Sequence, residues 1–468
     1  MGGGSLLVRL GCVAACVAGV WLGGAVGCAP ARPAPPDVVF VVVDTLRADR
    51  LGTYGNPRGL TPFLDELAMR GTRFANAYAA SSWTNPSVAS LWTSRYPSQH
   101  RVDRFESRLN DAEVTLAERL HGAGWSTAGF IGNLRLTRPL GFAQGFDRWA
   151  VTPSDKTATT DRLARRGMRW LARRWASSWW RRGSRRPVLF YFHCMEPHSP
   201  YSPRRAARER LGITTDLATR TAVNRKLVSL HWDSLDAGEV AILRDLYDGD
   251  VATLDARLRV LFAALAEQGV LDHALVVVTA DHGEEFREHG WMAHGFTLYE
   301  PSIRVPLILL GPGIPAGRVV DQNVSLVDVA PTVLALLGLD AEPRFEGRSL
   351  VPLLAGAGGE PVDIVVELAR ASAIPPTAEH RAALVRGRAK LIARYDPSPT
   401  WLLNELYDLA RDPGETDPVA PAVLPLAAEL GSVLDRRTLD LAERAGLPAR
   451  APVADEMRGR LRALGYAN

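Results

Sequence analysis

Long uninterrupted runs of hydrophobic residues are the strongest pattern along this chain. They occupy Val38–Val43, Val188–Phe192, Leu275–Thr279 and Pro306–Leu310. Continuous apolar runs are typical of parallel strands that are buried on both faces of a sheet, whereas strands with one wet face alternate. These four segments therefore predict the inner strands of a mainly parallel sheet.

Helical segments separate these strands. Thr61 and Pro62 suit an N-cap and a first helical position, and Gly71 ends that helix. Strands that alternate with helices predict an α/β fold in which helices sandwich the sheet, with ligands bound beyond the carboxyl ends of the strands. The other expected helices cover residues 115–123, 250–268 and 325–337.

The pattern changes after about residue 359. Short strands joined by turns predict a small antiparallel sheet, and helical segments follow it. We therefore expect a main domain over residues 37–359 and a C-terminal subdomain over 360–468. The expected strands of the subdomain cover 363–368, 383–386, 389–394 and 405–409, and its helices cover 424–445 and 455–464.

The first 36 residues are expected to be an export signal and a tether. An apolar core follows Arg9, and small residues then precede Cys28, as in bacterial lipoproteins. Residues 1–27 would be the signal peptide, Cys28 the lipidated first residue and 28–36 a Pro-rich tether. Cys16 also fits the cleavage pattern but leaves too short a core, and an uncleaved signal anchor is the alternative. The lipoprotein interpretation predicts a periplasmic or outer-membrane location in a bacterial cell envelope.

Composition limits the class of protein without naming it. Of 468 residues 47% are hydrophobic and 23% charged, which excludes a disordered chain, a fibrous repeat and a polytopic membrane protein. The net charge is +4, and acidic residues are interspersed with the arginines, so we expect no nucleic-acid partner. After removal of the signal, only Cys194 remains besides Cys28, so a disulfide framework is not expected.

One stretch departs from that even distribution of charge. Residues 162–186 contain ten arginines interleaved with four tryptophans. This composition suits a helix that lies on anionic lipid head groups, beside the lipid anchor on Cys28. The alternative is a solvated helix whose tryptophans pack on the body of the protein.

Two of the predicted strands end in acidic residues. Asp44 directly follows the first run, and Asp281 with His282 directly follows a later one. A lone strand-end aspartate is more often a turn or cap residue, but two such sites, one beside a histidine, can converge on one divalent cation. The pattern favours a metal site at the carboxyl edge of the sheet.

A candidate nucleophile lies between them in the sequence. Asn85 and Pro86 suit the cap and first position of a helix, which places Thr84 just before a helix N-terminus. Free amide groups there attract an anionic ester, and a bound metal lowers the pKa of a hydroxyl so that it can attack. Without the metal residues, the simpler interpretation is that Thr84 only helps to cap the helix.

Many motifs in one order carry a family resemblance. From about residue 37 to its end, the chain resembles the sulfatase family of the alkaline phosphatase superfamily. That family has an α/β sandwich and a small C-terminal sheet, as the pattern predicts. The matching segments are Val43–Asp49, Thr61–Asp65, Thr84–Pro97, Phe192–Tyr201, Asp281–Glu284, His289–Gly290, His294–Gly295, Arg304–Pro306, Glu405–Leu409 and Asp412–Pro413.

The chain also departs from the family pattern. Sulfatases carry a Cys or Ser that is converted to formylglycine within a Cys/Ser-x-Pro-x-Arg motif, whereas this chain has Thr84 and Val88 at the two ends of that motif. Thr45 replaces the second residue of an Asp-Asp pair, and His294 and Asn133 stand where the family has active-site lysines. The combination resembles nucleotide pyrophosphatase/phosphodiesterases, lipid A phosphoethanolamine transferases and lipoteichoic acid synthases, which use threonine.

That resemblance implies one metal ion held by Asp44, Thr84, Asp281 and His282. Carboxylates with imidazole favour Zn²⁺ or Mn²⁺ over Ca²⁺. The resemblance also implies in-line attack of Thr84 on phosphorus and a phospho-threonine intermediate that water or an acceptor alcohol resolves.

Further histidines are candidates around this centre. His198 and His294 could contact the phosphate or protonate the leaving group, could hold a second metal, or could only support the site. Glu196 and His289 are weaker supporting candidates.

We therefore expect an envelope enzyme, a metal-dependent hydrolase that cleaves a phosphate monoester or diester of a small molecule, glycan or lipid through Thr84. Three alternatives stay open: a sulfatase that works without formylglycine, a transferase that moves a phospho-group onto an envelope glycan or lipid, and a catalytically silent binding protein.

Overall fold

The computed structural model describes residues 35–152, 160–178, 186–358, 361–369, 380–396 and 400–419. The predicted lipoprotein signal with Cys28, nearly all of the tether and the predicted helices over 424–445 and 455–464 lie outside these residues. Among the described residues, no helix is both long and apolar enough to cross a lipid bilayer.

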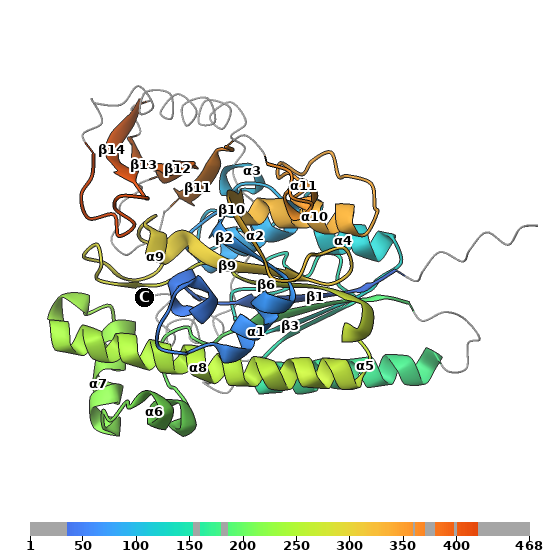
Figure 1. The fold of residues 1–468 in the computed structure, drawn as a ribbon, viewed down its shortest axis with the longest axis horizontal. Coiled ribbons are helices and arrows are strands. Elements are labelled where there is room, and N and C mark those ends of the chain that lie inside the picture. The colour runs from blue at the N-terminus through green and yellow to red at the C-terminus, as the bar shows by residue number, and fades with distance from the viewer. Residues whose placement is uncertain are drawn as a thin grey trace, which may run out of the picture. The chain divides into compact units, whose positions relative to one another are not determined.

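An eight-stranded sheet forms the centre of the fold (Figure 1). Its strand order is β10-β2-β9-β6-β1-β5-β3-β4, and every pair is parallel except the two that β9 makes with β2 and β6. The strands span Asp37–Val43 (β1), Thr72–Tyr78 (β2), Ser126–Ile131 (β3), Arg148–Val151 (β4), Val188–Cys194 (β5), Ala274–Ala280 (β6), Arg304–Leu310 (β9) and Arg318–Ser325 (β10).

The predicted fold class is confirmed, with one error in strand direction. β1, β5 and β6 are parallel neighbours whose residues are all buried, as their continuous apolar sequence predicted. β9 is also apolar and buried but runs antiparallel. Burial on both faces dictates apolar composition and carries no information about direction.

Helices cover both faces of this sheet. Figure 1 shows α1, α5 and α8 on one face and α2, α4 and α10 on the other. The helices span Pro62–Arg70 (α1), Thr84–Thr93 (α2), Pro97–His100 (α3), Leu116–Gly122 (α4), Thr160–Ser178 (α5), Arg205–Leu211 (α6), Leu217–Val228 (α7), Ala237–Glu267 (α8), Glu300–Ile303 (α9), Val329–Leu336 (α10) and Val351–Leu354 (α11).

Two predicted helices have different bounds. The segment 250–268 is only the second half of α8, which begins after the capping residue Asp236, whose side chain accepts from the amide of Glu239. The segment 325–337 contains a 3-10 turn over Leu326–Asp328 before α10 begins.

A small antiparallel sheet follows, in the order β11-β12-β13-β14. All four predicted strands are present, three of them longer than predicted. Glu367 joins this sheet to the main one, since its amide donates to the carbonyl oxygen of Ala80 at 2.9 Å and its carboxylate accepts from the amide of Ser98 at 2.7 Å. The strands span Ile364–Ala369 (β11), His380–Arg386 (β12), Ala389–Asp396 (β13) and Thr400–Asp408 (β14), and a further hairpin joins Glu285–Phe286 (β7) to Met292–Ala293 (β8).

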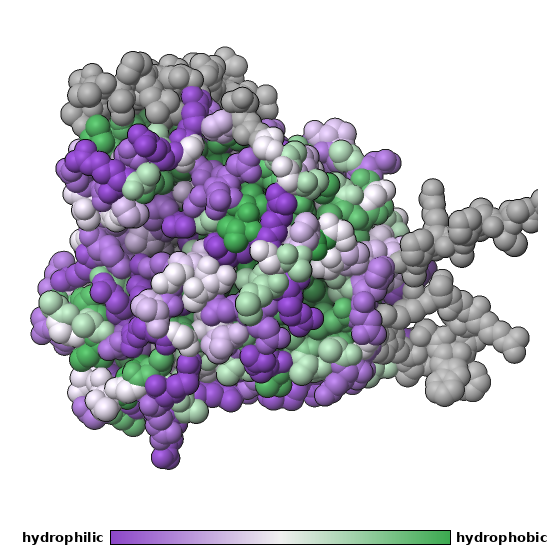
Figure 2. Space-filling model, viewed as in Figure 1, coloured by the Kyte–Doolittle hydropathy of each residue, from purple (hydrophilic) through white to green (hydrophobic). Residues whose placement is uncertain are grey.

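The face of the molecule drawn in Figure 2 is mostly hydrophilic. On the face drawn in Figure 2, hydrophobic residues form separate groups among hydrophilic ones. Large exposed hydrophobic side chains among the described residues are Met69, Leu217, Val260 and Val319, which lie on different elements.

Candidate active site

The predicted site residues meet where three central strands end. β1, β5 and β6 are parallel neighbours, so Val43, Cys194 and Ala280 end side by side. Asp44 follows β1, and its amide donates to the carbonyl oxygen of Cys194 at 2.9 Å. Asp281 follows β6, next to Asp44. This is the carboxyl edge of the sheet, where open α/β folds bind their ligands.

Asp44, Asp281 and His282 form a buried cluster that could hold a metal ion. One ligand atom of each lies within 4.8 Å of the others, and His282 Nε2 is 3.6 Å from both Asp44 Oδ1 and Asp281 Oδ2. These two carboxylate oxygens are buried and lack a hydrogen-bond partner within the described ranges. Because uncompensated buried charge is strongly unfavourable, two orphaned oxygens that face one imidazole fit a divalent cation.

The protonation states in this cluster also suit a cation. Burial and the neighbouring Asp44 carboxylate raise the pKa of Asp281 well above its usual range. Burial and then the charge of His294 lower the pKa of His282 to about 3, so its ring is neutral. His282 Nδ1 lies 2.9 Å from the carbonyl oxygen of Gly283 and is assigned as the donor there. The Nε2 lone pair therefore faces the carboxylates, as in metal-ligating histidines.

Thr84 is the first residue of α2 rather than the residue before the helix. Trp83 is the N-cap, and Asn85 and Pro86 occupy the second and third helical positions. The predicted cap at Asn85 is therefore wrong. The first four amide groups of a helix have no intrahelical partner, so a proline is tolerated at the third position as well as at the first.

The Thr84 hydroxyl faces the metal cluster. Its Oγ1 lies 3.3 Å from His282 Nε2 and 3.4 Å from Asn133 Nδ2, and the residue is buried. The structure thus brings Thr84 together with the three other predicted metal ligands, Asp44, Asp281 and His282. The next residue of α2, Asn85, is buried, and neither of its side-chain amide atoms has a hydrogen-bond partner among the residues described.

Asn133 and His193 contact one oxygen of the Asp44 carboxylate. Asn133 Nδ2 lies 2.5 Å and His193 Nε2 3.2 Å from Asp44 Oδ2. Tyr191 lies behind them, with its hydroxyl 2.7 Å from His193 Nδ1. Burial alone would raise the pKa of Asp44, but His198 and His193 hold it well below its usual range.

Sequence reasoning missed His193. It is the penultimate residue of β5, directly after the predicted apolar run, and it was included in the Phe192–Tyr201 motif without a role. The available signal was its position, since a polar residue at the end of a strand beside β1 must lie next to Asp44.

His198 and His294 both lie beside the metal cluster. The ring of His294 is 4.6 Å from that of His282 and 5.0 Å from that of His198, measured between centroids. His294 Nδ1 contacts Glu284 Oε1 at 2.9 Å, and the Tyr201 hydroxyl donates to the other oxygen of Glu284 at 3.0 Å. Burial raises the pKa of Glu284 to about 7 and lowers that of His198. Glu284 therefore orients His294, a role that the sequence did not predict.

The weaker candidates lie elsewhere. Glu196 pairs with Arg257 and accepts from the amide of Thr160 at 3.1 Å. His289 stacks on Tyr299 with ring centroids 3.7 Å apart. Within the described ranges, no hydrogen bond or ion pair joins Glu196 or His289 to the metal cluster.

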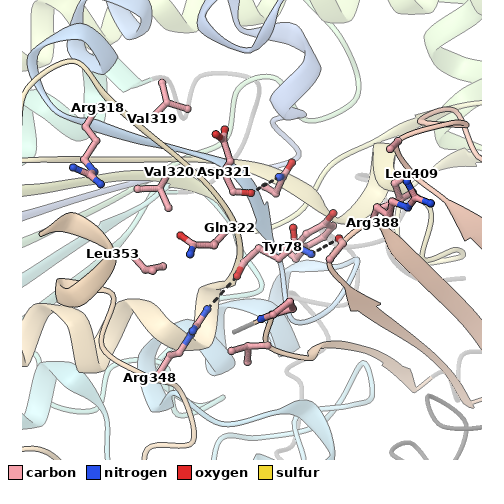
Figure 3. Close-up of a pocket in the computed structure, with 16 residues that line it drawn as sticks. Tyr78, Arg318, Val319, Val320, Asp321, Gln322, Arg348, Leu353, Arg388 and Leu409 are labelled. Atoms are coloured by element: carbon pink, nitrogen blue, oxygen red, sulfur yellow. Dashed lines mark hydrogen bonds between the residues drawn. The ribbon is translucent and has the colours of Figure 1, made fainter. Parts of the chain in front are cut away.

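A cavity of about 670 Å³ lies between the edge strand β10 and the small sheet. Its lining includes Tyr78, Arg318, Gln322, Arg348 and Arg388 (Figure 3). β10 is the fourth strand from β1, which places the cavity about 19 Å from the metal cluster at about 4.8 Å per strand. None of the predicted catalytic or metal residues lines it, so it is separate from the candidate active site.

Solved structures support the fold. A phosphonate monoester hydrolase of Agrobacterium radiobacter matches with a TM-score of 0.68 and 21% identity, over 87% of this chain and 96% of that one. A protein solved in complex with its substrate D-glucosamine-2-N,6-O-disulfate matches with a TM-score of 0.69 and 20% identity, over 88% and 98%.

Curated sulfatases match this chain over most of its length. N-acetylglucosamine-6-O-sulfatase of Bacteroides thetaiotaomicron is 26% identical over 81% of this chain and 82% of its own length. Choline-sulfatase of Rhizobium meliloti is 28% identical over 81% of each. The family model described as N-sulphoglucosamine sulphohydrolase, C-terminal, matches residues 287–437. The model described as Sulfatase matches residues 36–339, well over half of the sequence. The chain therefore belongs to the sulfatase family, whose members are metal-dependent hydrolases of the alkaline phosphatase superfamily.

Proposed function

We propose that this chain hydrolyses an anionic ester with Thr84 as the nucleophile. The proposal rests on one observation, the 3.3 Å separation of Thr84 Oγ1 and His282 Nε2 beside two carboxylate oxygens that have no hydrogen-bond partner among the described residues. A divalent cation held by Asp44, Asp281 and His282, with Thr84 as a further ligand, would lower the pKa of the hydroxyl and offset the charge of the ester. The donor set favours Zn²⁺ or Mn²⁺.

The chain's own groups supply the other steps. The Thr84 hydroxyl releases its proton to solvent, and Oγ1 forms a bond to the central sulfur or phosphorus while the bond from that atom to the leaving oxygen breaks. His198 or His294 donates a proton to the leaving oxygen, which departs as the alcohol. Water then attacks the same atom and the bond to Oγ1 breaks, and the two protons of the water restore the Thr84 hydroxyl and the protonated histidine. The first-turn amides of α2 and the side chain of Asn85 can donate to the non-bridging oxygens.

A sulfate ester is the first substrate class to test. Curated relatives that match over most of this chain include N-acetylglucosamine-6-O-sulfatase and choline-sulfatase. This support favours sulfate over the phosphate ester that the sequence alone led us to expect.

A phosphorus ester is the second candidate. It is favoured by Thr84 and Val88, which remove the formylglycine motif, and by the shared fold of a phosphonate monoester hydrolase. The preference for phosphate remains a prediction.

Rates with aryl esters separate these candidates. Metal-loaded protein should be assayed with p-nitrophenyl sulfate, p-nitrophenyl phosphate, bis-p-nitrophenyl phosphate and a p-nitrophenyl phosphonate. The largest kcat/KM identifies the substrate class. Loss of ester at equal rates with and without an acceptor alcohol supports hydrolysis, whereas transfer to the alcohol in preference to water supports the transferase. Bound metal without turnover of any ester would overturn the proposal in favour of a silent binding protein.

We also propose that the chain is a lipoprotein of a bacterial envelope, anchored through Cys28. Support comes from the sequence before residue 37 alone. Metabolic labelling with a fatty acid should mark the wild type and leave Cys28→Ser unlabelled, and label on both would contradict the assignment.

A further inference from the structure

The net positive charge of this protein is concentrated on helix α5. α5 contains six arginines and one acidic residue, Asp161, for a net charge of +5. The whole chain carries only +4, so the residues outside α5 sum to about −1. A charge difference of this size within one domain points to a partner of opposite sign.

The positive face of α5 is not neutralised by its surroundings. Asp161 pairs with Arg204 and Arg257, which lie outside the helix. Arg165, Arg169 and Arg173 are exposed, lie on one face at successive intervals of four residues, and form no hydrogen bond or ion pair within the described ranges. Burial together with the neighbouring charges of Arg148, Arg169 and Arg162 lowers the pKa of Arg166, as expected where positive charge is dense.

The opposite face of α5 packs against the sheet and gives its direction. Thr160, at the start, donates its amide to Glu196, just beyond the carboxyl end of β5. A β-carbon on Gly167 would lie 3.0 Å from the ring of Phe192, and the ring of Trp170 packs edge-on against Phe190 at 5.5 Å. The helix therefore runs antiparallel to β5, from the active-site edge to the opposite edge. The prediction that tryptophans pack on the body holds for Trp170.

The end of α5 extends past that opposite edge. From Trp170 the helix continues for eight residues to Ser178, or about 12 Å. From Phe190 back to the start of β5 at Val188 is only two residues, or about 7 Å. Only the last turn of α5, from about residue 175, thus projects beyond the strands, whereas Arg173, about 4.5 Å past Trp170, lies beside the start of β5.

The chain enters the domain at this same edge. Asp37, the first residue of β1, accepts from the amide of Val188 at 2.8 Å, and Trp125 donates from Nε1 to the carbonyl oxygen of Pro36 at 3.0 Å. Figure 1 shows the start of β1 and the end of α5 on the same side, away from α9. The 34 residues before Pro35, which are expected to carry the anchor, therefore connect to the edge of the sheet at which α5 ends.

We propose that the arginine face of α5, centred on Arg165, Arg169 and Arg173, docks on anionic lipid head groups. The proposal rests on charge, register and the point of chain entry, and is independent of the substrate.

The test measures binding of the full chain to vesicles. Vesicles of phosphatidylcholine alone report the contribution of the N-terminal segment, and vesicles that also contain phosphatidylglycerol report the electrostatic contribution. Each arginine near an anionic surface contributes about fivefold in affinity. Arg165→Gln/Arg169→Gln/Arg173→Gln should therefore lower affinity for the anionic vesicles about 100-fold and leave binding to phosphatidylcholine unchanged. The wild-type preference should also decline with added salt.

A matched variant removes three arginines from the active-site edge instead. Arg205, Arg210 and Arg225 are exposed on α6 and α7. The triple Gln variant at these positions should keep its preference for anionic vesicles. Circular dichroism and hydrolysis of a small soluble ester should be unchanged in both variants. Equal loss in the two variants, no wild-type preference for phosphatidylglycerol, or binding of duplex DNA in place of vesicles at physiological salt would overturn the proposal.

Discussion

Two of the places where the protein buries charged groups are built differently. In the metal cluster, Asp44 and Asp281 face a neutral His282, and each has a buried oxygen without a partner in the described chain. Between the main and small sheets, Lys390 is fully buried with its Nζ 2.6 Å from Glu415 Oε1 and 3.1 Å from Glu300 Oε1.

The difference indicates which cluster is complete without a ligand. Lys390 supplies a cation to the carboxylates that surround it, so that cluster joins β13 to the segments around α9 and β14 by protein groups alone. Within the described ranges, neither carboxylate of the metal cluster pairs with a lysine or an arginine. Removing a partner should therefore cost stability in the Lys390 cluster, whereas the metal cluster should respond to an added metal.

Loss of the nucleophile should have the largest effect. We expect Thr84→Ala to reduce kcat by on the order of 10⁴- to 10⁶-fold, because the step that forms the covalent intermediate is lost. Bound metal, measured by elemental analysis, should remain because Asp44, Asp281 and His282 are unchanged. Thr93→Ala, at the other end of α2, is the control and should keep activity. Wild-type turnover in Thr84→Ala would show that the hydroxyl is not the nucleophile.

Removing the positive charge of Lys390 should destabilise the folded protein. Lys390→Met leaves Glu300 and Glu415 buried together, and we expect the free energy of unfolding to decline by about 3–5 kcal/mol. Lys226→Met removes a partly exposed pair with Glu239 and should cost about 1 kcal/mol or less. Denaturant unfolding of both variants checks this. Equal losses would mean that burial of Lys390 carries no special cost.

Metal removal should lower stability only through the metal cluster. Metal at 100 times its Kd stabilises the folded state by about 2.7 kcal/mol, so chelation should lower the free energy of unfolding by about that amount. In Asp281→Asn the chelator should have little effect, and the metal-free variant should be at least as stable as metal-free wild type because the repulsion with Asp44 is relieved. Lys226→Met should respond like wild type. A chelator effect of equal size in Asp281→Asn would contradict the proposed ligand set.

The smallest effect expected is on the pH dependence of stability. The pKa of His282 is lowered to about 3 in the folded state from 6.5, so below pH 6.5 the unfolded chain binds a proton that the folded protein does not. Stability from this group is fully present above pH 6.5 and is lost as pH declines towards 3, by about 1.4 kcal/mol per pH unit. Metal-free His282→Asn should show a shallower decline between pH 6.5 and 5 in thermal unfolding. An identical decline would assign the dependence to other groups.

Local pattern was enough to place most of the metal cluster. Asp44 and Asp281 each follow a fully apolar strand, and parallel strands bring their ends to one edge, so sequence order alone indicated their proximity. His193 was missed because it lies inside β5, where its neighbours all read as core. The orientation of His294 by Glu284 depends on a loop whose path the sequence does not reveal.

Some strands and contacts of the fold were not predicted from the sequence. β2 and β10 contain many polar residues and lie at or next to the sheet edge, so they lack the continuous apolar signal of β1. The contacts of Lys390 with Glu300 and Glu415 join residues far apart in the sequence. Such pairs arise from tertiary packing, which periodicity does not encode.

Cys194 has a practical consequence for experiments on this protein. It is the only cysteine in the part of the chain that the structure describes, it is fully buried at the end of β5, and burial raises the pKa of its thiol to about 12. Maleimide reagents attack exposed thiolates, so this side chain should not react in the native fold. Once Cys12, Cys16 and Cys28 are replaced, a cysteine introduced on the surface of the domain would therefore be a selective attachment point for a spectroscopic reporter, with Cys194 left in place.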